Sequence, residues 1–337
     1  MDTIKRDNAV ARDLGRFDVL VYGGGLSGWA AAVSLARSGS SVLLAAPRTS
    51  LGHEIWASMT TWWPPECELP PLWAEVVGEL ERVNATRGSM VDPVATQVAL
   101  ERTAEEAGVE LLMQVWAHPR EDGLLFSGRW GLMAAQGGLC VDATERASLA
   151  IEAGAVTRER ATDEPVVRRA LMVKTGVAEP ERIEVGEDLP LVDGSVMAWT
   201  GVWPGDVILQ AELDLPRDDV TALEIESRRV MGDLAAHLRA SRDDFAAGSL
   251  VHIAHDPILP RDRVLVATGD DRQVATVNCG VDGIPVARGM MLPAGSERMV
   301  AASPALDLGD IAAQSCYHAP NAVALGEAAA AVCAELL

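Results

Sequence analysis

The feature that most limits what this chain can fold into is a glycine-rich turn, Gly23-x-Gly25-x-x-Gly28. An apolar run precedes the turn, an alanine-rich stretch follows it, and a second apolar run comes next. Residues 17–46 therefore predict one unit of strand, tight turn, helix and strand, as found in parallel sheets.

Each part of this unit suits a dinucleotide. The first glycine permits the turn, the second lets the backbone approach a pyrophosphate, and the third lets the helix pack on the strand. Leu26 and Ser27 lie at the start of the helix, where backbone N–H groups and the helix dipole attract phosphate. We expect these two residues and the three glycines to bind a dinucleotide; the alternative is a glycine turn with a purely structural role.

Length and charge narrow the class of protein. The 337 residues correspond to about two domains, and 49% hydrophobic with 23% charged residues is typical of a folded globular chain. The 28 Lys and Arg against 49 Asp and Glu give a net charge of −21, which repels nucleic acid and anionic membranes. No apolar run reaches the ~18 residues of a membrane span, and no apolar signal core opens the chain. We expect a cytoplasmic protein that binds neither nucleic acid nor membrane.

Neither cysteines nor histidines form a metal-binding pattern. The five cysteines are scattered and lack any C-x-x-C pair, so they are interpreted as small buried thiols. His252 and His255 stand three residues apart, a spacing that would direct them to opposite faces of a strand, and no third ligand is evident. We therefore predict no metal site.

The rest of the chain shows two kinds of sequence pattern. Residues 1–16 are polar and aperiodic and predict a flexible N-terminal arm. The stretch from about residue 160 to 283 combines charged loops with alternating strands and one long helix. Outside it, the patterns return to those of a dinucleotide domain. Expected helices cover 92–107, 220–239 and 321–336, and expected strands cover 109–116, 123–128, 129–136, 138–144, 195–199, 205–211 and 299–302.

Three sequence blocks together resemble a known family. They are Val19-Leu-Val-Tyr-Gly-Gly-Gly-Leu-Ser-Gly28, the strand end Val141-Asp-Ala-Thr144, and Arg298-Met-Val-Ala-Ala302 with the helix that follows. In this order and spacing they resemble FAD-dependent oxidoreductases with a glutathione-reductase-like FAD domain, and most closely the fumarate-reductase-related branch.

The resemblance implies an α/β fold, with a Rossmann-like FAD-binding domain interrupted by a smaller α+β substrate domain. The FAD domain would comprise residues 17–160 and 284–337, and the substrate domain residues 161–283. FAD would be the cofactor. By the family's pattern, Thr144 would lie beside FAD, Asp307 would bind the ribityl chain, and Asn321 would begin the helix that faces the isoalloxazine.

The sequence also departs from the family. Where the family places a glutamate on the adenosine ribose, this chain has Ala46, followed by Pro47 and Arg48, and Glu145 replaces the glycine of the second motif. FAD would then bind weakly, through another contact such as Arg48, or covalently, or would be lost. His53 lies on the loop that carries the covalent flavin bond in succinate dehydrogenase and fumarate reductase flavoproteins. The alternative for His53 is an uncharged ring packed near the flavin.

The resemblance implies oxidation of a small organic metabolite by hydride transfer to flavin N5, with a protein base for the proton. His318 precedes the helix that faces the flavin and is the preferred base. His255 is a second candidate, and Arg261 would pair with a substrate carboxylate. The alternatives are a solvated histidine and a loop charge.

Four tryptophans, at 56, 62, 63 and 73, are placed either near the flavin and substrate or in the core. Two other functions stay open. One is a flavoprotein subunit that needs a partner redox subunit, and the other is a flavin-free descendant that acts as a binding or scaffold protein. A homo-oligomer is also left open, as are the substrate and the electron acceptor.

Overall fold

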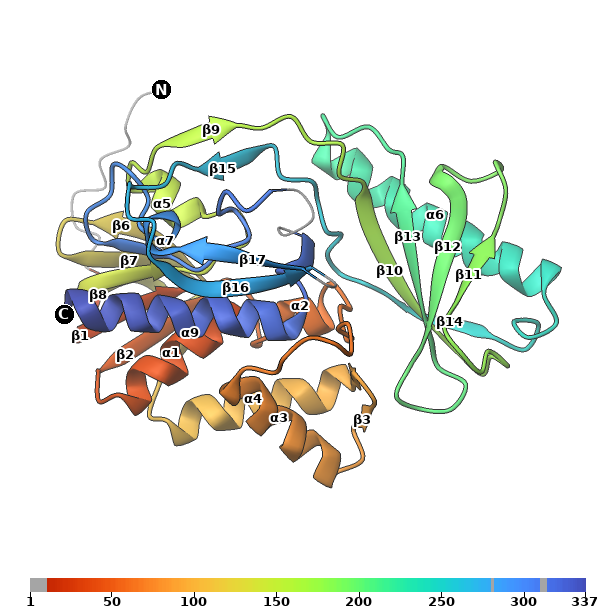
Figure 1. The fold of residues 1–337 in the computed structure, drawn as a ribbon, viewed down its shortest axis with the longest axis horizontal. Helices are drawn as coiled ribbons and strands as arrows, with labels where there is room; N and C mark the ends of the chain where they lie inside the picture. Colours follow the sequence, from red (N-terminus) through yellow and green to blue (C-terminus); the bar gives the residue numbers. More distant parts are fainter. Residues whose placement is uncertain (1–10, 280–281, 310–313) are drawn as a thin grey trace.

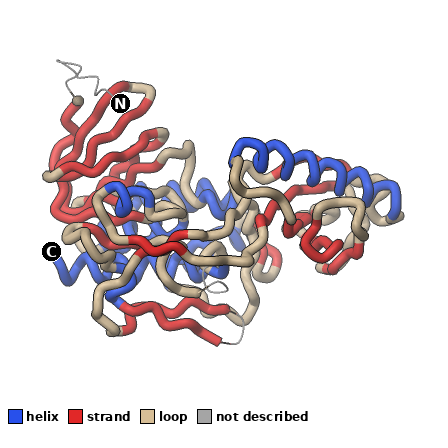
Figure 2. The backbone as a smooth tube through the Cα atoms, turned by 90° about the horizontal axis from the view of Figure 1, so that it is seen from above, coloured by secondary structure: helices blue, strands red, loops and turns tan. Residues whose placement is uncertain are grey.

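Two sheets, each with its own hydrophobic core, make up the fold (Figure 1). The computed structural model describes residues 11–279, 282–309 and 314–337. The view in Figure 2 shows the second sheet and its long helix at one end of the molecule. The expected fold class, a Rossmann-like α/β domain interrupted by a smaller α+β domain, is confirmed.

The first sheet has seven strands in the order β5-β2-β1-β8-β7-β6, with β18 paired to β8. The contacts β1–β2, β1–β8, β2–β5 and β8–β18 are parallel, whereas β6–β7 and β7–β8 are antiparallel. The carboxyl ends of β1, β2, β8 and β18 therefore meet at one edge, where open parallel sheets bind ligands. The strands are β1 (Arg12–Tyr22), β2 (Val42–Ala46), β5 (Glu110–Met113), β6 (Val115–Arg120), β7 (Gly123–Gly128), β8 (Gly131–Asp142) and β18 (Met299–Ala301).

Helices cover the parallel part of this sheet. The first and last helices lie side by side (Figure 1), so close that a Cβ on Gly326 would stand 2.2 Å from the carbonyl oxygen of Ser27. Trp29 is fully buried in the first helix, and its indole N–H donates to the carbonyl of Leu100 at 2.9 Å. Burying such a side chain contributes about 2–3 kcal/mol. The helices of this domain are α1 (Leu26–Arg37), α2 (His53–Trp56), α3 (Pro71–Arg82), α4 (Pro93–Glu106), α5 (Ser148–Glu152), α7 (Arg288–Met291) and α9 (Ala319–Leu336).

The second sheet is antiparallel, in the order β11-β12-β13-β10-β14. The long helix α6 (Val220–Ser241) covers one face, and Val230, Met231 and Leu234 lie in its core. Asp219 caps this helix by accepting from the N–H groups of the next turn. The strands are β10 (Val166–Val173), β11 (Glu181–Glu184), β12 (Leu191–Thr200), β13 (Val207–Leu213) and β14 (Ser249–Ile253).

One short strand pair lies where the chain passes between the two parts. The outgoing chain and the returning chain run antiparallel to each other as β9 (Thr157–Glu159) and β15 (Arg263–Leu265). The remaining pairs are β3 (Thr86–Arg87) with β4 (Met90–Val91), and β16 (Gln273–Cys279) with β17 (Asp282–Ala287).

Several boundaries differ from the sequence predictions. Strand β1 begins at Arg12, so residues 12–16 belong to a strand rather than to the expected arm, and residues 1–10 lie outside the described residues. Leu265, Val277 and Val286 belong to the core of the first domain. The chain therefore returns to that domain before residue 284, because β15, β16 and β17 pack on it.

Two strand assignments also change. The single strand expected at 109–116 is divided into β5 and β6 by Gln114, whose φ of 60° is incompatible with a continuous strand. Conversely, the two strands expected at 129–136 and 138–144 are one, β8, which runs through Gly137 and Gly138. This long strand pairs with β1 on one side and with β7 on the other.

Candidate functional site

The glycine turn connects β1 to α1 at the carboxyl edge of the first sheet. Gly23 has a φ of +123°, and a Cβ there would lie 2.4 Å from the backbone of Ala143. A Cβ on Gly28 would lie 1.9 Å from the carbonyl oxygen of Gly23. Gly25 precedes the first residue of the helix without any side-chain cap of its own. Packing therefore requires glycine at positions 23 and 28, whether or not a ligand binds.

The first turn of α1 is capped from another element. Glu54, on α2, is 6% exposed and accepts from the Leu26 N–H with both carboxylate oxygens, at 3.1 and 3.0 Å. A negative charge is favourable at a helix N-terminus, which is also the place where dinucleotide pyrophosphates bind. The N–H groups of Ser27 and Gly28 have no backbone acceptor among the described residues. Glu54 thus uses one of the amides that a phosphate needs.

His53 lies beside this cap. Its ring is buried, with Nδ1 at 3.7 Å from the Glu54 carboxylate and Cε1 at 2.8 Å from the place of a Cβ on Gly25. Sequence reasoning identified His53 but missed Glu54. The only local signal for Glu54 was a carboxylate next to that histidine, on the loop that leads from the second strand.

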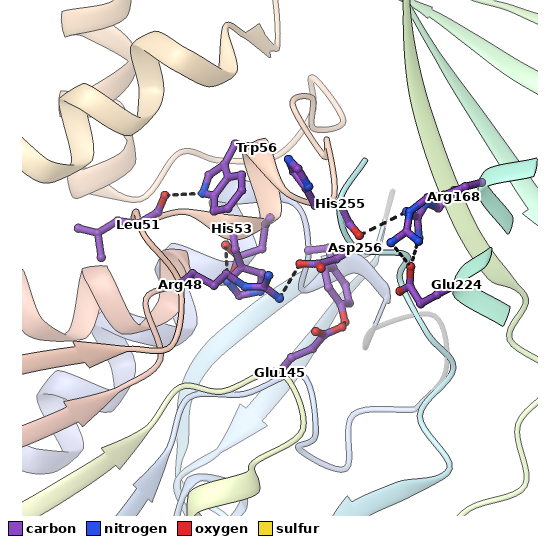
Figure 3. A network of polar contacts seen from close by, with 12 residues as sticks. Arg48, Leu51, His53, Trp56, Glu145, Arg168, Glu224, His255 and Asp256 are labelled. Atoms are coloured by element: carbon purple, nitrogen blue, oxygen red, sulfur yellow. Dashed lines mark hydrogen bonds and ion pairs between the residues drawn. The ribbon is translucent and has the colours of Figure 1, made fainter. Parts of the chain in front are cut away.

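The expected ribose position holds no acid. Ala46 is buried, and a Cβ on Gly24 would lie 2.8 Å from its methyl group. Arg48, two residues on, forms an ion pair with Asp256 at 2.5 Å (Figure 3). This pair joins the loop after β2 to the segment after β14, so Arg48 is engaged across the two domains.

The second sequence block, residues 141–144, ends in a turn. The backbone N–H and the hydroxyl of Thr144 donate to the buried Asp142 carboxylate at 2.9 and 2.7 Å, and the Ser148 N–H donates to the Thr144 hydroxyl. The next residue, Glu145, accepts a hydrogen bond from the Tyr317 hydroxyl. Burial, and then the Glu145 charge, raise the pKa of Tyr317 well above its usual value, so it stays protonated and remains a donor.

The region of the third sequence block, which runs from residue 298 into α9, is also stabilised by contacts within the chain. Asp307 pairs with Arg158 at 2.5 Å. The Asn321 side chain, in the first turn of α9, accepts from the Asn278 N–H at 2.9 Å and donates to the carbonyls of Asn278 and Ser315. Its hydrogen-bonding capacity thus ties α9 to β16.

His318 stands immediately before α9, facing the second domain. Its ring lies 4.7 Å from that of Trp62, and its buried Nδ1 has no partner among the described residues. Burial, reinforced by the charge of Arg169, lowers the pKa of His318 to about 4. The imidazole is therefore neutral at physiological pH.

The other two candidate catalytic residues lie in different surroundings. The exposed His255 contacts the rings of Trp56 and His252, at 5.8 and 5.0 Å. The two histidines come together because β14 ends at Ile253, so the expectation of opposite faces is wrong. Arg261 is 3% exposed and pairs with Glu164 at 3.2 Å.

The tryptophan cluster is divided between the core and the boundary of the domains. Trp63 and Trp73 pack edge to face, and both are buried in the first core. Trp62 stacks on Trp199 of β12, with ring centroids 4.1 Å apart. A cavity of about 590 Å³ lies over Trp62, Trp63 and Trp199. The core interpretation thus holds for Trp73, whereas Trp62 faces the second domain.

The described residues contain neither a metal site nor a membrane helix. No group of three or more His, Cys, Asp or Glu side chains there is arranged to hold a metal ion. None of the helices in the same residues is long and apolar enough to cross a bilayer.

Cys140 and Cys333 are buried, which raises their pKa values to about 11 and about 12 and leaves them as thiols.

The residues fit FAD in one respect and oppose it in another. The backbone fits, because the glycine turn presents the N–H groups of Ser27 and Gly28 at a helix N-terminus. The side chains above it do not fit in this conformation, since Glu54 covers the Leu26 N–H. A dinucleotide would bind here only after this carboxylate moves aside.

Comparisons with known proteins agree with the fold. Residues 18–184 match the sequence model of the family described as FAD dependent oxidoreductase. This segment contains the glycine turn, the second motif and the beginning of the second sheet. It carries the sequence pattern of FAD-dependent oxidoreductases, although no curated protein sequence matches the chain significantly.

Solved structures with the same fold are distant in sequence. A p-nitrophenol 4-monooxygenase from Pseudomonas putida aligns with a TM-score of 0.57 and 13% identity, over 96% of this chain and 81% of its own. A geranylgeranyl bacteriochlorophyll reductase-like protein from Thermoplasma acidophilum gives 0.53 and 14%, over 95% and 78%. A point mutant of NikD, an unusual amino acid oxidase essential for nikkomycin biosynthesis, gives 0.52 and 16%, over 96% and 95%. At these identities, the likeness is one of fold.

Proposed function

We propose that this chain is an FAD-dependent oxidoreductase that oxidises a small organic metabolite. The observation that carries the proposal is the glycine turn, inside a segment that matches the FAD-dependent family. Two N–H groups of this turn have no backbone acceptor in the described part of the chain. When bound, FAD supplies an acceptor for a hydride at N5. The second sheet, inserted between β9 and β15, supports assignment to the fumarate-reductase-related branch.

The chain's own residues have separate roles in this proposal. The amides of Ser27 and Gly28 would hold the pyrophosphate, and His53 would pack near the flavin without a covalent bond. Within the part of the chain that the structure describes, Nδ1 of His318 has no hydrogen-bond partner. The neutral imidazole can accept a hydrogen bond at the boundary of the two domains, and it would act there as a weak base. Thr144, Asp307 and Asn321 would act by shaping the turn and the start of α9 rather than by direct contact.

A visible absorption spectrum tests this function. Purified protein is mixed with excess FAD and separated from free flavin, and retained flavin bands are expected. Acid precipitation should then release the flavin into the supernatant. Flavin that stays with the precipitate, and is released by His53→Ala, would instead support a covalent bond. No retained bands after reconstitution would contradict the oxidoreductase proposal.

One observation favours a second function, a flavin-free binding protein with the same fold. Glu54 on Leu26, Tyr317 on Glu145 and the Arg48–Asp256 pair all satisfy polar groups from within the chain. This alternative predicts that neither FAD nor ADP stabilises the protein in a thermal shift measurement. Stabilisation by both would favour the enzyme.

The need for a partner redox subunit stays a prediction of its own. If the chain binds FAD without a partner but reduces no acceptor dye with any substrate, a partner is implied.

Light scattering on the purified protein measures whether it forms a homo-oligomer.

A further inference from the structure

A small cavity lies between the two domains, beside His318. Its volume is about 180 Å³. The first domain contributes the segment after α2 and the segment before α9, and the second contributes β10 and β13. The side chains used below are Thr60, Trp62, Arg169, Gln210, Glu212 and His318.

Arg169 is the unusual residue of this cavity. It is 5% exposed, and its guanidinium donates to the Gln210 side chain at 2.9 Å, the Ser58 carbonyl at 3.1 Å and the Thr60 hydroxyl at 2.8 Å. All three acceptors are neutral, and Arg169 forms no ion pair with any of the described residues. Nη2 takes part in none of these three bonds. A buried cation without a carboxylate partner is costly, so an anion in the cavity would relieve a real penalty.

Other unsatisfied nitrogen atoms surround the same place. Nδ1 of His318 and the indole nitrogen of Trp62 are buried without a hydrogen-bond partner among the described residues. Burial lowers the pKa of Arg169 to about 10, so it keeps its charge at neutral pH. The neutral imidazole of His318 can place a proton on either nitrogen. The cavity therefore offers a buried cation and nearby nitrogen atoms, and the carboxylate that lines it, Glu212, forms no ion pair with Arg169.

A carboxylate near Arg169 limits the ligand further, because Glu212 of β13 lies two residues from Gln210, the cross-strand neighbour of Arg169. Glu212 also lines the cavity and is exposed to solvent. Glu212 would repel a second carboxylate on the ligand, whereas the guanidinium of Arg169 would hold the first against this repulsion. Size and charge together favour a small organic acid with one carboxylate, with Trp62 available to its apolar part.

We propose that this cavity binds the carboxylate of a small organic acid, with Arg169 as its cationic partner and His318 beside it. The identification of this acid as the substrate rests on the proposed oxidoreductase function. Binding of the carboxylate itself does not, because neither Arg169 nor His318 depends on FAD in the structure. Arg169 thereby takes the role that sequence reasoning gave to Arg261, which already pairs with Glu164.

The test uses the full chain and a series of matched probes. Acetate, propionate and benzoate are titrated by calorimetry, and so are their neutral amides, acetamide, propionamide and benzamide. At least one carboxylate should bind at millimolar concentration or below, about tenfold or more tighter than its amide. Equal affinity for acid and amide, or no binding by any carboxylate in the series, would overturn the proposal.

Variants assign the binding to this cavity. Arg169→Gln should weaken carboxylate binding about tenfold or more and remove the preference over the amide, while Arg169→Lys should keep part of that preference. Arg239→Gln removes an equal charge from an exposed position on α6 and should leave binding unchanged. If Arg169→Gln and Arg169→Lys both bind carboxylate like the unmodified protein, the proposal fails.

The FAD measurement remains separate. Carboxylate binding without retained flavin would leave the cavity assignment standing and contradict only the oxidoreductase. Retained flavin without carboxylate binding would support the oxidoreductase and contradict the cavity assignment.

Discussion

Glu54 is the residue whose position has the largest consequence for cofactor binding. Its carboxylate occupies the helix terminus at which a pyrophosphate would bind, and it satisfies the Leu26 amide with both oxygens. Any dinucleotide therefore competes with a group of the same charge that is already tethered to the chain. Affinity for FAD is reduced by the free energy needed to displace this cap.

Removing this carboxylate should increase the affinity for FAD. Glu54→Ala frees the amide and removes a repulsive charge, so we expect about tenfold tighter binding, measured by flavin fluorescence quenching. Loss of the cap should also lower the free energy of unfolding by about 1 kcal/mol. Glu68→Ala, which removes an exposed carboxylate from the same region, is the control and should change neither quantity. Unchanged or weaker FAD binding in Glu54→Ala would show that Glu54 does not compete with the cofactor.

His318 predicts a pH dependence of stability. Its pKa falls from 6.5 to about 4 on folding, so between these values the unfolded state binds the proton and the folded state does not. The contribution of His318 is fully present above pH 6.5 and is lost as the pH falls toward 4, with a slope of at most about 1.4 kcal/mol per pH unit.

Chemical denaturation across this pH range measures the effect. The unmodified protein should lose stability more steeply than His318→Gln, whose side chain does not titrate. Parallel curves for the two proteins would contradict the lowered pKa.

Sequence reasoning reached some of these residues and missed others for physical reasons. The motif around Gly23 and Gly28 was readable because it depends on local backbone geometry. Glu54 and Arg169 were not, because their partners lie far away along the chain, at Leu26 and at Ser58 and Thr60. Spacing along the sequence contains no signal for such contacts.

At the scale of elements, the connection from β1 to α1 depends on how closely β8 approaches it. The turn leaves no space for side chains at Gly23 or Gly28, since both abut backbone atoms. Backbone cannot rotate away as a flexible side chain can, so a substitution must shift the helix or the strand.

Gly28→Ala should therefore destabilise the protein by about 2 kcal/mol or more, because its Cβ would meet the Gly23 carbonyl at 1.9 Å. Gly78→Ala, within α3, is the matched control, since a Cβ there meets no atom within 4 Å. That substitution should be neutral or stabilise by about 0.5–1 kcal/mol. Differential scanning fluorimetry ranks the two variants, and equal melting temperatures would refute the close approach.

Elements with regular patterns were predictable. The helices at 93–106 and 220–241 follow apolar periodicity and begin at aspartate caps, Asp92 and Asp219, so their limits agree with expectation within a few residues. Strand β10 is a harder case, because two buried arginines, Arg168 and Arg169, interrupt an apolar strand. Arg168 is compensated by Glu224 of α6 at 3.0 Å, a contact that only the tertiary fold creates.

At the scale of the whole molecule, polar side chains connect two separate cores. The Arg48–Asp256 pair and the Arg169 hydrogen bonds to Ser58 and Thr60 cross from one domain to the other. The sequence correctly predicted an inserted domain, but not where the chain returns to the first domain, since β15 to β17 lack the sequence patterns of that domain. Their assignment is decided by packing on α9 and β9.

Breaking the Arg48–Asp256 pair should loosen this connection. A double-mutant cycle with Arg48→Gln and Asp256→Asn should give a coupling energy of about 0.5–1 kcal/mol that decreases in high salt, because both side chains are partly exposed. The Asp256 amide donates to the Ala57 carbonyl across the same boundary at 3.0 Å, and it should also exchange faster with deuterium in each single variant.

The control is an ion pair of similar geometry within one element, Arg229–Asp233 on α6, at 2.9 Å. Its disruption by Asp233→Asn should leave exchange of the Asp256 amide unchanged. Equal effects from both pairs would mean that Arg48–Asp256 has no specific role between the domains.

The stacked pair Trp62 and Trp199 has an optical consequence. The two indoles come from different domains, and their centroids are 4.1 Å apart at an interplanar angle of 24°. Electronic transitions in chromophores this close couple, which splits their absorption into two circular dichroism bands of opposite sign. Separation of the domains would abolish this couplet while each sheet kept its own signal. The protein therefore contains an intrinsic, label-free reporter of whether its two halves are together.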